Sequence, residues 1–265
     1  MNKGLILSTL LILLSGCGSS DTPTQIELPT EPQPPVVVNE GSAPPDNRTK
    51  QPYYILFFGN SHTGALPDLL TTLFNAMPEL KAEIIKKAPG SGYLSDRLND
   101  TASIAAINES PWTHIVLQAQ KYSQSGGAVY PTDAAQTWIS RSKNIAATPI
   151  LFPEHPQKNN STEGQMLQTL HEGIASKEPA CIAPVGLVWD EALIQKPTIA
   201  LHDDDGNHAN QAGNFLTALV FFEVISGKAA TSLPFIDSIN LNNETQQWMK
   251  QVVSSVLGAK PACPF

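Results

Sequence analysis

Apolar runs and amphipathic segments alternate along the chain after residue 52. Residues 53–58 (YYILFF) are apolar or aromatic at every position, which is typical of a strand covered on both faces of a sheet. In the next segment, 66–77, leucines recur at helical spacing. The same alternation predicts further strands at 81–86, 114–117, 149–152 and 181–185, and further helices at 132–147, 162–176, 211–225 and 242–257.

This order of elements predicts the architecture. Strands that alternate with helices pair in parallel, because each crossover helix returns the chain to the same end of the sheet. The sequence therefore predicts an α/β domain, a three-layer α/β/α sandwich around a parallel sheet of about five strands. Ligands of such sheets lie at the carboxyl ends of the strands, so the residues that directly follow each strand are the candidates for chemistry.

The N-terminal end carries the pattern of an export signal, predicted over residues 1–16. Lys3 precedes an apolar run over 5–14 that is too short to span a bilayer as a mature helix. The run ends in LSGC (14–17), which resembles the lipobox of bacterial lipoproteins. The resemblance implies cleavage before Cys17 and acylation of Cys17 with palmitate-type chains. These would anchor the protein to the cell envelope, in the outer membrane of a Gram-negative organism. The alternative is a secretory signal without lipid.

Composition separates a tether from a domain. Residues 17–52 are rich in proline and polar residues and have little apolar surface to bury, so we expect a disordered tether there and a folded domain over 53–265. The chain has a net charge of −8, which argues against a nucleic-acid partner and against a domain that binds anionic lipid. Contact with the membrane is expected through the lipid anchor only.

Two cysteines remain once Cys17 is assigned to the lipid. In an oxidising compartment a remaining pair usually forms a disulfide. We therefore expect Cys181 and Cys263 to be bonded, which would tie the C-terminal tail to a buried strand. Two buried free thiols are the alternative.

A candidate nucleophile follows the first predicted strand. Ser61 lies in GNSHTG (59–64), a run of small and polar residues between a buried strand and a helix. Such a turn exposes a serine at the edge of the sheet, close to the positive end of the helix. The alternative role for Ser61 is to cap the helix.

A candidate base lies far along the chain, before the apolar helix 211–225. Asp205 and His208 are three positions apart, so the carboxylate can orient the imidazole locally while the other ring nitrogen faces a nucleophile. A surface acidic loop is one alternative. Another is a metal site that uses His202, Asp203 and Asp204 as well, although the spacing matches neither an EF-hand nor a zinc helix motif.

Together the two blocks resemble the SGNH (GDSL-like) hydrolase superfamily. ILFFGNSHT (55–63) resembles the family's first block, and DDGNHANQAGNFLTA (204–218) resembles its last block, with APVGLVW (183–189) also similar to one bacterial branch. The resemblance covers nearly all of 53–265. It implies a flavodoxin-like sheet and a catalytic Ser61, Asp205 and His208. It also implies hydrolysis of an ester through an acyl-serine without a metal or organic cofactor. An α/β-hydrolase matches less well, because its elbow has a second glycine where Thr63 stands.

The resemblance also implies donors for the oxyanion. These are the backbone N–H of Ser61 and that of a glycine in APGSGYL (88–94), where Gly92 is favoured over Gly90. The family's third donor is an asparagine, but HIVLQAQK (114–121) has Gln120 at that position and Gln118 at the preceding glycine position. An amide of Gln120 could donate the same hydrogen bond with one more methylene of reach. Otherwise both glutamines only support the loop.

Other chemically capable side chains are given lesser roles. His62 is expected to contact substrate at most, because a neighbour in sequence usually points elsewhere. His155 follows a strand and is expected near the same cleft, and Tyr93 and Tyr122 are expected to contact substrate. The hypothesis is a serine esterase, acting on O-acyl groups such as acetyl on a carbohydrate. The alternative is an inactive SGNH-like domain that binds a glycan or a protein, and the departure at Gln120 favours it.

Overall fold

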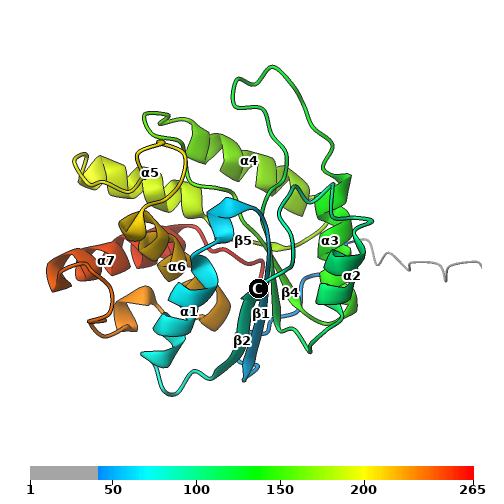
Figure 1. The fold of residues 1–265 in the computed structure, drawn as a ribbon, viewed down its shortest axis with the longest axis horizontal. Coiled ribbons are helices and arrows are strands. Elements are labelled where there is room, and N and C mark those ends of the chain that lie inside the picture. Colours follow the sequence, from blue (N-terminus) through cyan, green and yellow to red (C-terminus); the bar gives the residue numbers. More distant parts are fainter. Residues whose placement is uncertain (1–40) are drawn as a thin grey trace, which may run out of the picture. The chain divides into compact units, whose positions relative to one another are not determined.

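A parallel sheet forms the centre of the computed structural model, which describes residues 41–265 (Figure 1). Its five strands lie in the order β2-β1-β3-β4-β5. This order and the helices on both faces confirm the predicted flavodoxin-like α/β/α sandwich. The strands are β1 (Tyr53–Phe58), β2 (Ala82–Lys87), β3 (His114–Leu117), β4 (Thr148–Leu151) and β5 (Cys181–Ile182).

Two separate apolar cores hold the three layers together. Alternate residues of β1 face opposite sides, so Phe57 packs on Phe221 at one face and Phe58 on Trp138 at the other. On the first face lie α1 (Leu66–Asn75), α5 (Val185–Gln195), α6 (Gln211–Ser226) and α7 (Asn243–Ala259). On the second face lie α2 (Thr101–Ile107) and α3 (Asp133–Asn144), together with the apolar side of α4 (Glu163–Ala175).

Among residues 41–265 no helix is long and apolar enough to cross a membrane.

Around β5 the prediction of a strand over 181–185 is partly wrong. The strand ends at Ile182, and the helix α5, which was not predicted, begins at Val185. Pro184 is the reason, because it lacks the N–H that would continue the sheet and stands at the N-cap position of α5. The short helix α2 was also not predicted.

The folded domain begins before residue 53, so the predicted boundary of the tether needs correction. Asn47 is buried, and its amide donates to the carbonyls of Thr113 (2.8 Å) and Ala146 (2.9 Å). The carbonyl of Pro45 accepts from the hydroxyl of Thr148 at 2.6 Å. Residues 42–48 are therefore part of the domain. The predicted signal peptide, Cys17 and the tether up to residue 40 lie outside the described residues.

The C-terminal tail lies beside β5. Cys181 and Cys263 form a disulfide, and the N–H of Ile182 donates to the carbonyl of Ala262 at 2.7 Å. The tail thus covers the edge of the sheet that β5 would otherwise leave unpaired.

Candidate active site

Ser61 begins a single 3-10 turn (Ser61–Thr63) shortly after β1, at the carboxyl end of this inner strand of the sheet. The side chain of Asn60 accepts the N–H of His62 at 3.0 Å and so closes the turn. Gly59 has no room for a side chain, because a Cβ there would lie 2.4 Å from Oε1 of Gln118. The amide of Gln118 in turn accepts the N–H of Asn60 at 2.7 Å, which holds the turn against β3. These contacts present Ser61 to solvent at the sheet edge.

A chain of hydrogen bonds connects Ser61, His208 and Asp205. Oγ of Ser61 lies 2.7 Å from Nε2 of His208, and Nδ1 of His208 lies 2.5 Å from Oδ2 of Asp205. Oδ1 of Asp205 accepts the backbone N–H groups of Asn207 and His208, each at 2.9 Å. The hydrogen bond from the His208 ring, followed by those from the backbone, holds the pKa of Asp205 well below its usual range. Asp205 therefore stays ionised and keeps the proton of His208 on Nδ1, which leaves Nε2 free to accept from Ser61.

The loop that carries Asp205 and His208 is held by the loop that follows β4. The N–H of Lys158 donates to the carbonyl of Gly206 at 2.8 Å, and the amide of Gln157 donates to the Asn207 side chain at 2.9 Å. Nε2 of His155 lies 3.0 Å from the carbonyl oxygen of Asn207. Its ring stacks on Trp189, with 4.0 Å between the centroids, so His155 supports the loop from within the protein and is not among the residues that line the cleft.

His62 lies against the base, contrary to the expectation that it points elsewhere. Its ring stacks on that of His208 with 5.0 Å between the centroids and 19° between the planes, and its side chain is 8% exposed. Burial, and then the neighbouring His208, lower the pKa of His62 to about 4. At neutral pH the ring of His62 is therefore uncharged where it stacks on the ring of the candidate base, His208.

Glu154 lies beneath the same site. The amide of Gln118 donates to its Oε1, and its Oε2 lies 3.8 Å from Nε2 of His62. Burial raises the pKa of Glu154 to about 7, so a carboxyl that is normally ionised is about half protonated at neutral pH. Its place in the loop that follows β4 was the available sequence signal, but sequence reasoning did not select it.

Donors for an oxyanion are available on the backbone. Within the described residues, the N–H groups of Ser61 and Gly92 donate to no protein acceptor. Gly92 has a φ of 151°, which favours glycine, and the guanidinium of Arg97 holds the loop by donating to the carbonyls of Gly90 (3.1 Å) and Gly59 (2.9 Å). The choice of Gly92 over Gly90 stays a prediction.

Gln120 does not have its predicted role as an oxyanion donor. Its Nε2 donates to the carbonyls of Lys121 (2.9 Å) and Pro131 (3.1 Å), so both amide N–H groups are already used. Ala119, which has a φ of 75°, turns the chain at the end of β3. In this structure Gln120 fastens the loop after β3 to the start of α3 and offers no free donor to an oxyanion.

The cleft at Ser61 is wide and polar. Its volume is about 640 Å³, and the residues that line it include three tyrosines, Tyr93, Tyr122 and Tyr130, of which the first two were predicted to contact substrate. None of the described residues that line it is aliphatic. The rest of the lining is Asn60, Ser61, His62, Gln120, Ser123, Gln124, Ser125, Glu154, Asn207 and His208. Within residues 41–265, no group of three His, Cys, Asp or Glu side chains is placed to hold a metal ion.

Comparison with known proteins establishes the fold. No protein-family model matches the sequence, and no curated protein is significantly similar to it. A crystal structure of a DUF4886 family protein from Bacteroides uniformis is similar, with a TM-score of 0.61 and 14% identity over 79% of this chain and 96% of that chain. A candidate SGNH hydrolase from Slackia heliotrinireducens is similar with a TM-score of 0.51 and 22% identity, over 64% of this chain and 97% of that one. The chain therefore has the fold of the SGNH hydrolases, as the sequence motifs predicted.

Proposed function

We propose that this chain, built on the SGNH hydrolase fold, is a serine ester hydrolase in which Ser61 is the nucleophile. The observation that carries the proposal is the unbroken set of hydrogen bonds from Ser61 through His208 to Asp205. A domain that only binds ligand has no need of an ionised Asp205 aligned with a histidine on a serine. The arrangement therefore favours the enzyme over the binding module.

In this mechanism His208 transfers one proton in each of two half-reactions, acylation and deacylation. Nε2 of His208 takes the proton of the Ser61 hydroxyl while Oγ bonds to the ester carbonyl carbon, and the N–H groups of Ser61 and Gly92 stabilise the oxyanion. As the tetrahedral intermediate collapses, the ester C–O bond breaks and His208 gives the proton to the leaving alcohol. Water then attacks the acyl-Ser61 with its proton passing to His208, and the carboxylic acid is released as Oγ regains that proton. Asp205 stabilises the imidazolium at both stages.

For the substrate, we propose a short acyl ester, such as acetyl, on a carbohydrate. Tyrosine rings and side-chain amides around Ser61 suit a polar, hydroxyl-rich alcohol, since they offer flat faces and hydrogen bonds together. A long acyl chain would need an apolar channel, but the described residues that line this cleft include no aliphatic side chain.

The test of the nucleophile is labelling with a fluorophosphonate, which reacts with activated serines. We expect the protein to be labelled, Ser61→Ala to abolish labelling, and His208→Ala to slow it by on the order of 10⁴-fold or more. Ser176→Ala is the matched control, because Ser176 is an exposed serine at the C-cap of α4, outside the cleft. Labelling of a folded Ser61→Ala protein at the rate of the unmodified protein would refute the assignment.

A comparison of acyl chains tests the substrate class. We expect p-nitrophenyl acetate to be hydrolysed faster than p-nitrophenyl decanoate, and acetylated oligosaccharides to release acetate in a Ser61-dependent manner. A preference for decanoate would contradict the carbohydrate ester and point to lipid.

We also propose that the protein is exported and anchored through acylated Cys17. The disulfide between Cys181 and Cys263 supports an oxidising compartment. Metabolic labelling with an alkynyl palmitate checks the anchor. Incorporation should disappear in Cys17→Ser, and a labelled Cys17→Ser protein would place the lipid elsewhere.

A further inference from the structure

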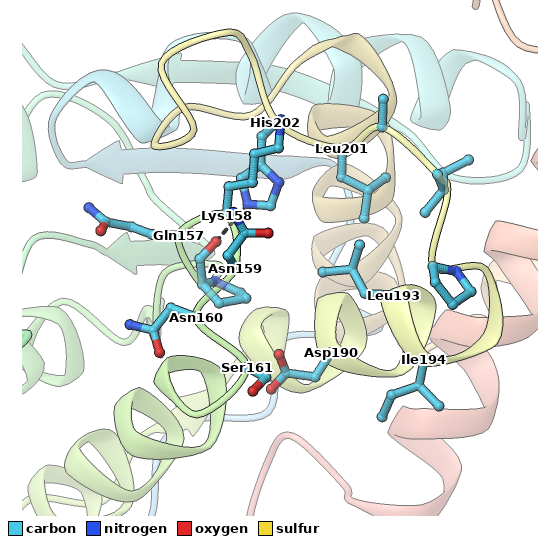
Figure 2. Close-up of a pocket in the computed structure, with 14 residues that line it drawn as sticks. Gln157, Lys158, Asn159, Asn160, Ser161, Asp190, Leu193, Ile194, Leu201 and His202 are labelled. Atoms are coloured by element: carbon cyan, nitrogen blue, oxygen red, sulfur yellow. Dashed lines mark hydrogen bonds between the residues drawn. The ribbon is translucent and has the colours of Figure 1, made fainter.

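A second cavity lies behind the loop that carries Asp205 and His208. It has a volume of about 390 Å³ and lies between α5, the loop after β4 and the segment that leads to His202 (Figure 2). It shares no lining residue with the cleft at Ser61. Its size falls within the range of small-molecule sites, which is about 300–1,000 Å³.

The wall of this cavity has an apolar part and a polar end. Leu193 from α5 and Leu201 from the facing segment point into it, and Asp190 lies beside Ser161 at its lower edge (Figure 2). Ile194 and Ile199 also contribute to the apolar part. A ligand that combines an apolar body with a polar group suits this wall.

Asp190 is a half-buried carboxylate without a partner. Neither it nor Ser161 makes a side-chain hydrogen bond to another described residue, and no described cation forms an ion pair with Asp190. Lys158, the cation among the lining residues, is exposed. The carboxylate packs on Gly164, where a Cβ would lie 2.3 Å from Oδ2. This contact keeps Asp190 in place against the first turn of α4.

The charge around Asp190 favours a cation. Burial, and then the nearby carboxylate of Glu163, raise the pKa of Asp190 to about 6, so the side chain is still mostly ionised at pH 7.5. Glu163 itself is buried and accepts from the hydroxyl of Tyr122 (2.9 Å) and from the backbone N–H of Gln157 (2.7 Å). Glu163 does not line the cavity, so an ammonium group here would pair with the carboxylate of Asp190 and could donate to the Ser161 hydroxyl.

We propose that this cavity is a second ligand site, which takes a small primary amine with a compact apolar body. The ammonium group pairs with Asp190, and the apolar body lies between Leu193 and Leu201.

The site also contacts the segments that hold the candidate base. Gln157 and Lys158, which line the cavity, bond to Asn207 and Gly206 of the loop that carries His208, and His202 lies 2.8 Å from the carbonyl of Pro156 through its Nε2. A bound amine should therefore change the rate at which Ser61 reacts, and this part of the inference rests on the proposed function.

Three compounds of matched size test the site on the full chain by ligand-observed NMR at pH 7.5: cyclohexylmethylamine, cyclohexylmethanol and cyclohexanecarboxylate. We expect the amine to bind about tenfold or more tightly than the alcohol, because a charge-assisted hydrogen bond adds to the same apolar contact, and the carboxylate to bind least. Asp190→Asn should remove the preference for the amine. Leu193→Trp should prevent binding of both the amine and the alcohol, because the larger side chain fills the cavity.

The control variant is Glu83→Gln, which removes an exposed carboxylate from β2, at the opposite edge of the sheet from β5. It should bind the amine like the unmodified protein. Equal binding of all three compounds, or amine binding that survives Leu193→Trp in a folded protein, would overturn the site.

Labelling of Ser61 by the fluorophosphonate, with and without saturating amine, tests the coupling separately. We expect a change of about twofold or more, absent in Asp190→Asn. An unchanged rate with bound amine overturns the coupling. A protein that binds the amine but is never labelled supports the site while refuting the proposed esterase.

Discussion

At the scale of single residues, His62 is the side chain most closely placed to influence His208 from outside the Ser61–His208–Asp205 chain. Its ring covers one face of the His208 ring and contacts His155 on another side, with 5.1 Å between those centroids. Because its pKa lies at about 4, it adds no positive charge beside the base at neutral pH. The contact therefore positions the His208 ring without opposing its protonation during the reaction.

We predict that His62→Ala lowers kcat by on the order of tenfold or more with little change in KM, because His208 loses the surface that fixes its ring plane. His62→Phe keeps a flat ring of similar reach and should recover most of the loss. The measurement is steady-state hydrolysis of p-nitrophenyl acetate by both variants. A His62→Ala enzyme with the original kcat would show that the stacked ring has no positioning role.

Glu154 supplies a second prediction, on stability. Its folded pKa of about 7 lies above its ordinary value of 4.5, so between these pH values the folded protein keeps a proton that the unfolded chain releases. Raising the pH through this window therefore lowers the free energy of unfolding. Glu154→Gln has no such proton to lose, and its carbonyl can still accept from Gln118.

Urea unfolding at pH 5 and pH 8 measures this effect. Glu154→Gln should gain stability relative to the unmodified protein on going from pH 5 to pH 8, whereas the exposed control Glu83→Gln should show no such difference. A pH-independent difference between Glu154→Gln and the unmodified protein would indicate that Glu154 ionises normally.

At the scale of elements, the residues that sequence reasoning could place are those with local signals. The strand β1 is apolar throughout, and α6 ends in a capping Gly227, so both were predicted closely. Ser61, Asp205 and His208 lie in short motifs whose spacing is itself informative. In contrast, α2 has only seven residues and α5 follows directly on Pro184, so neither shows the long amphipathic repeat that identifies a helix.

Roles that depend on tertiary contacts were not predictable in the same way. The orientation of Gln120 depends on the turn at Ala119 and on the carbonyl of Pro131, eleven positions away. The position of His62 depends on the 3-10 turn that rotates its ring toward a loop nearly 150 residues later in the chain. Neither contact leaves a periodic trace in the sequence.

The arm before β1 provides a prediction at this scale. Asn47 joins the arm to the ends of two other segments through the carbonyls of Thr113 and Ala146. Asn47→Ala removes both of these hydrogen bonds, while the carbonyl of Thr113 still accepts the N–H of Thr148 at 2.8 Å, so we expect a loss of about 1–3 kcal/mol in the free energy of unfolding. Thr49→Ala is the matched control, because Thr49 is exposed and makes no side-chain hydrogen bond to a described residue. Equal stability of the two variants in urea would mean that the arm adds nothing to the domain.

At the scale of the whole molecule, buried histidines determine the response to acid. His62, His114, His155 and His171 come from four different segments, and burial lowers the pKa of each from 6.5 to about 4, 3, 3 and 4 respectively. Below pH 6.5 these histidines bind protons in the unfolded chain but stay neutral in the folded protein until the pH approaches 4. Their contribution to stability is therefore fully present above pH 6.5 and is lost as the pH falls toward 4.

We predict that the free energy of unfolding decreases from pH 7 to pH 4. The slope with pH reports how many more protons the unfolded chain binds than the folded protein, and each of these histidines contributes at most about one proton to that difference. His171 can be isolated, because it is buried on α4, and its one hydrogen bond links Nδ1 to the carbonyl of Leu167 within that helix. His171→Leu should reduce the slope by about one proton between pH 4 and pH 6.5, measured by urea unfolding at half-unit steps. An unchanged slope would contradict burial of a neutral His171. Glu154 acts in the opposite direction as its carboxyl ionises, so the two effects together place the most stable pH of the domain near neutrality.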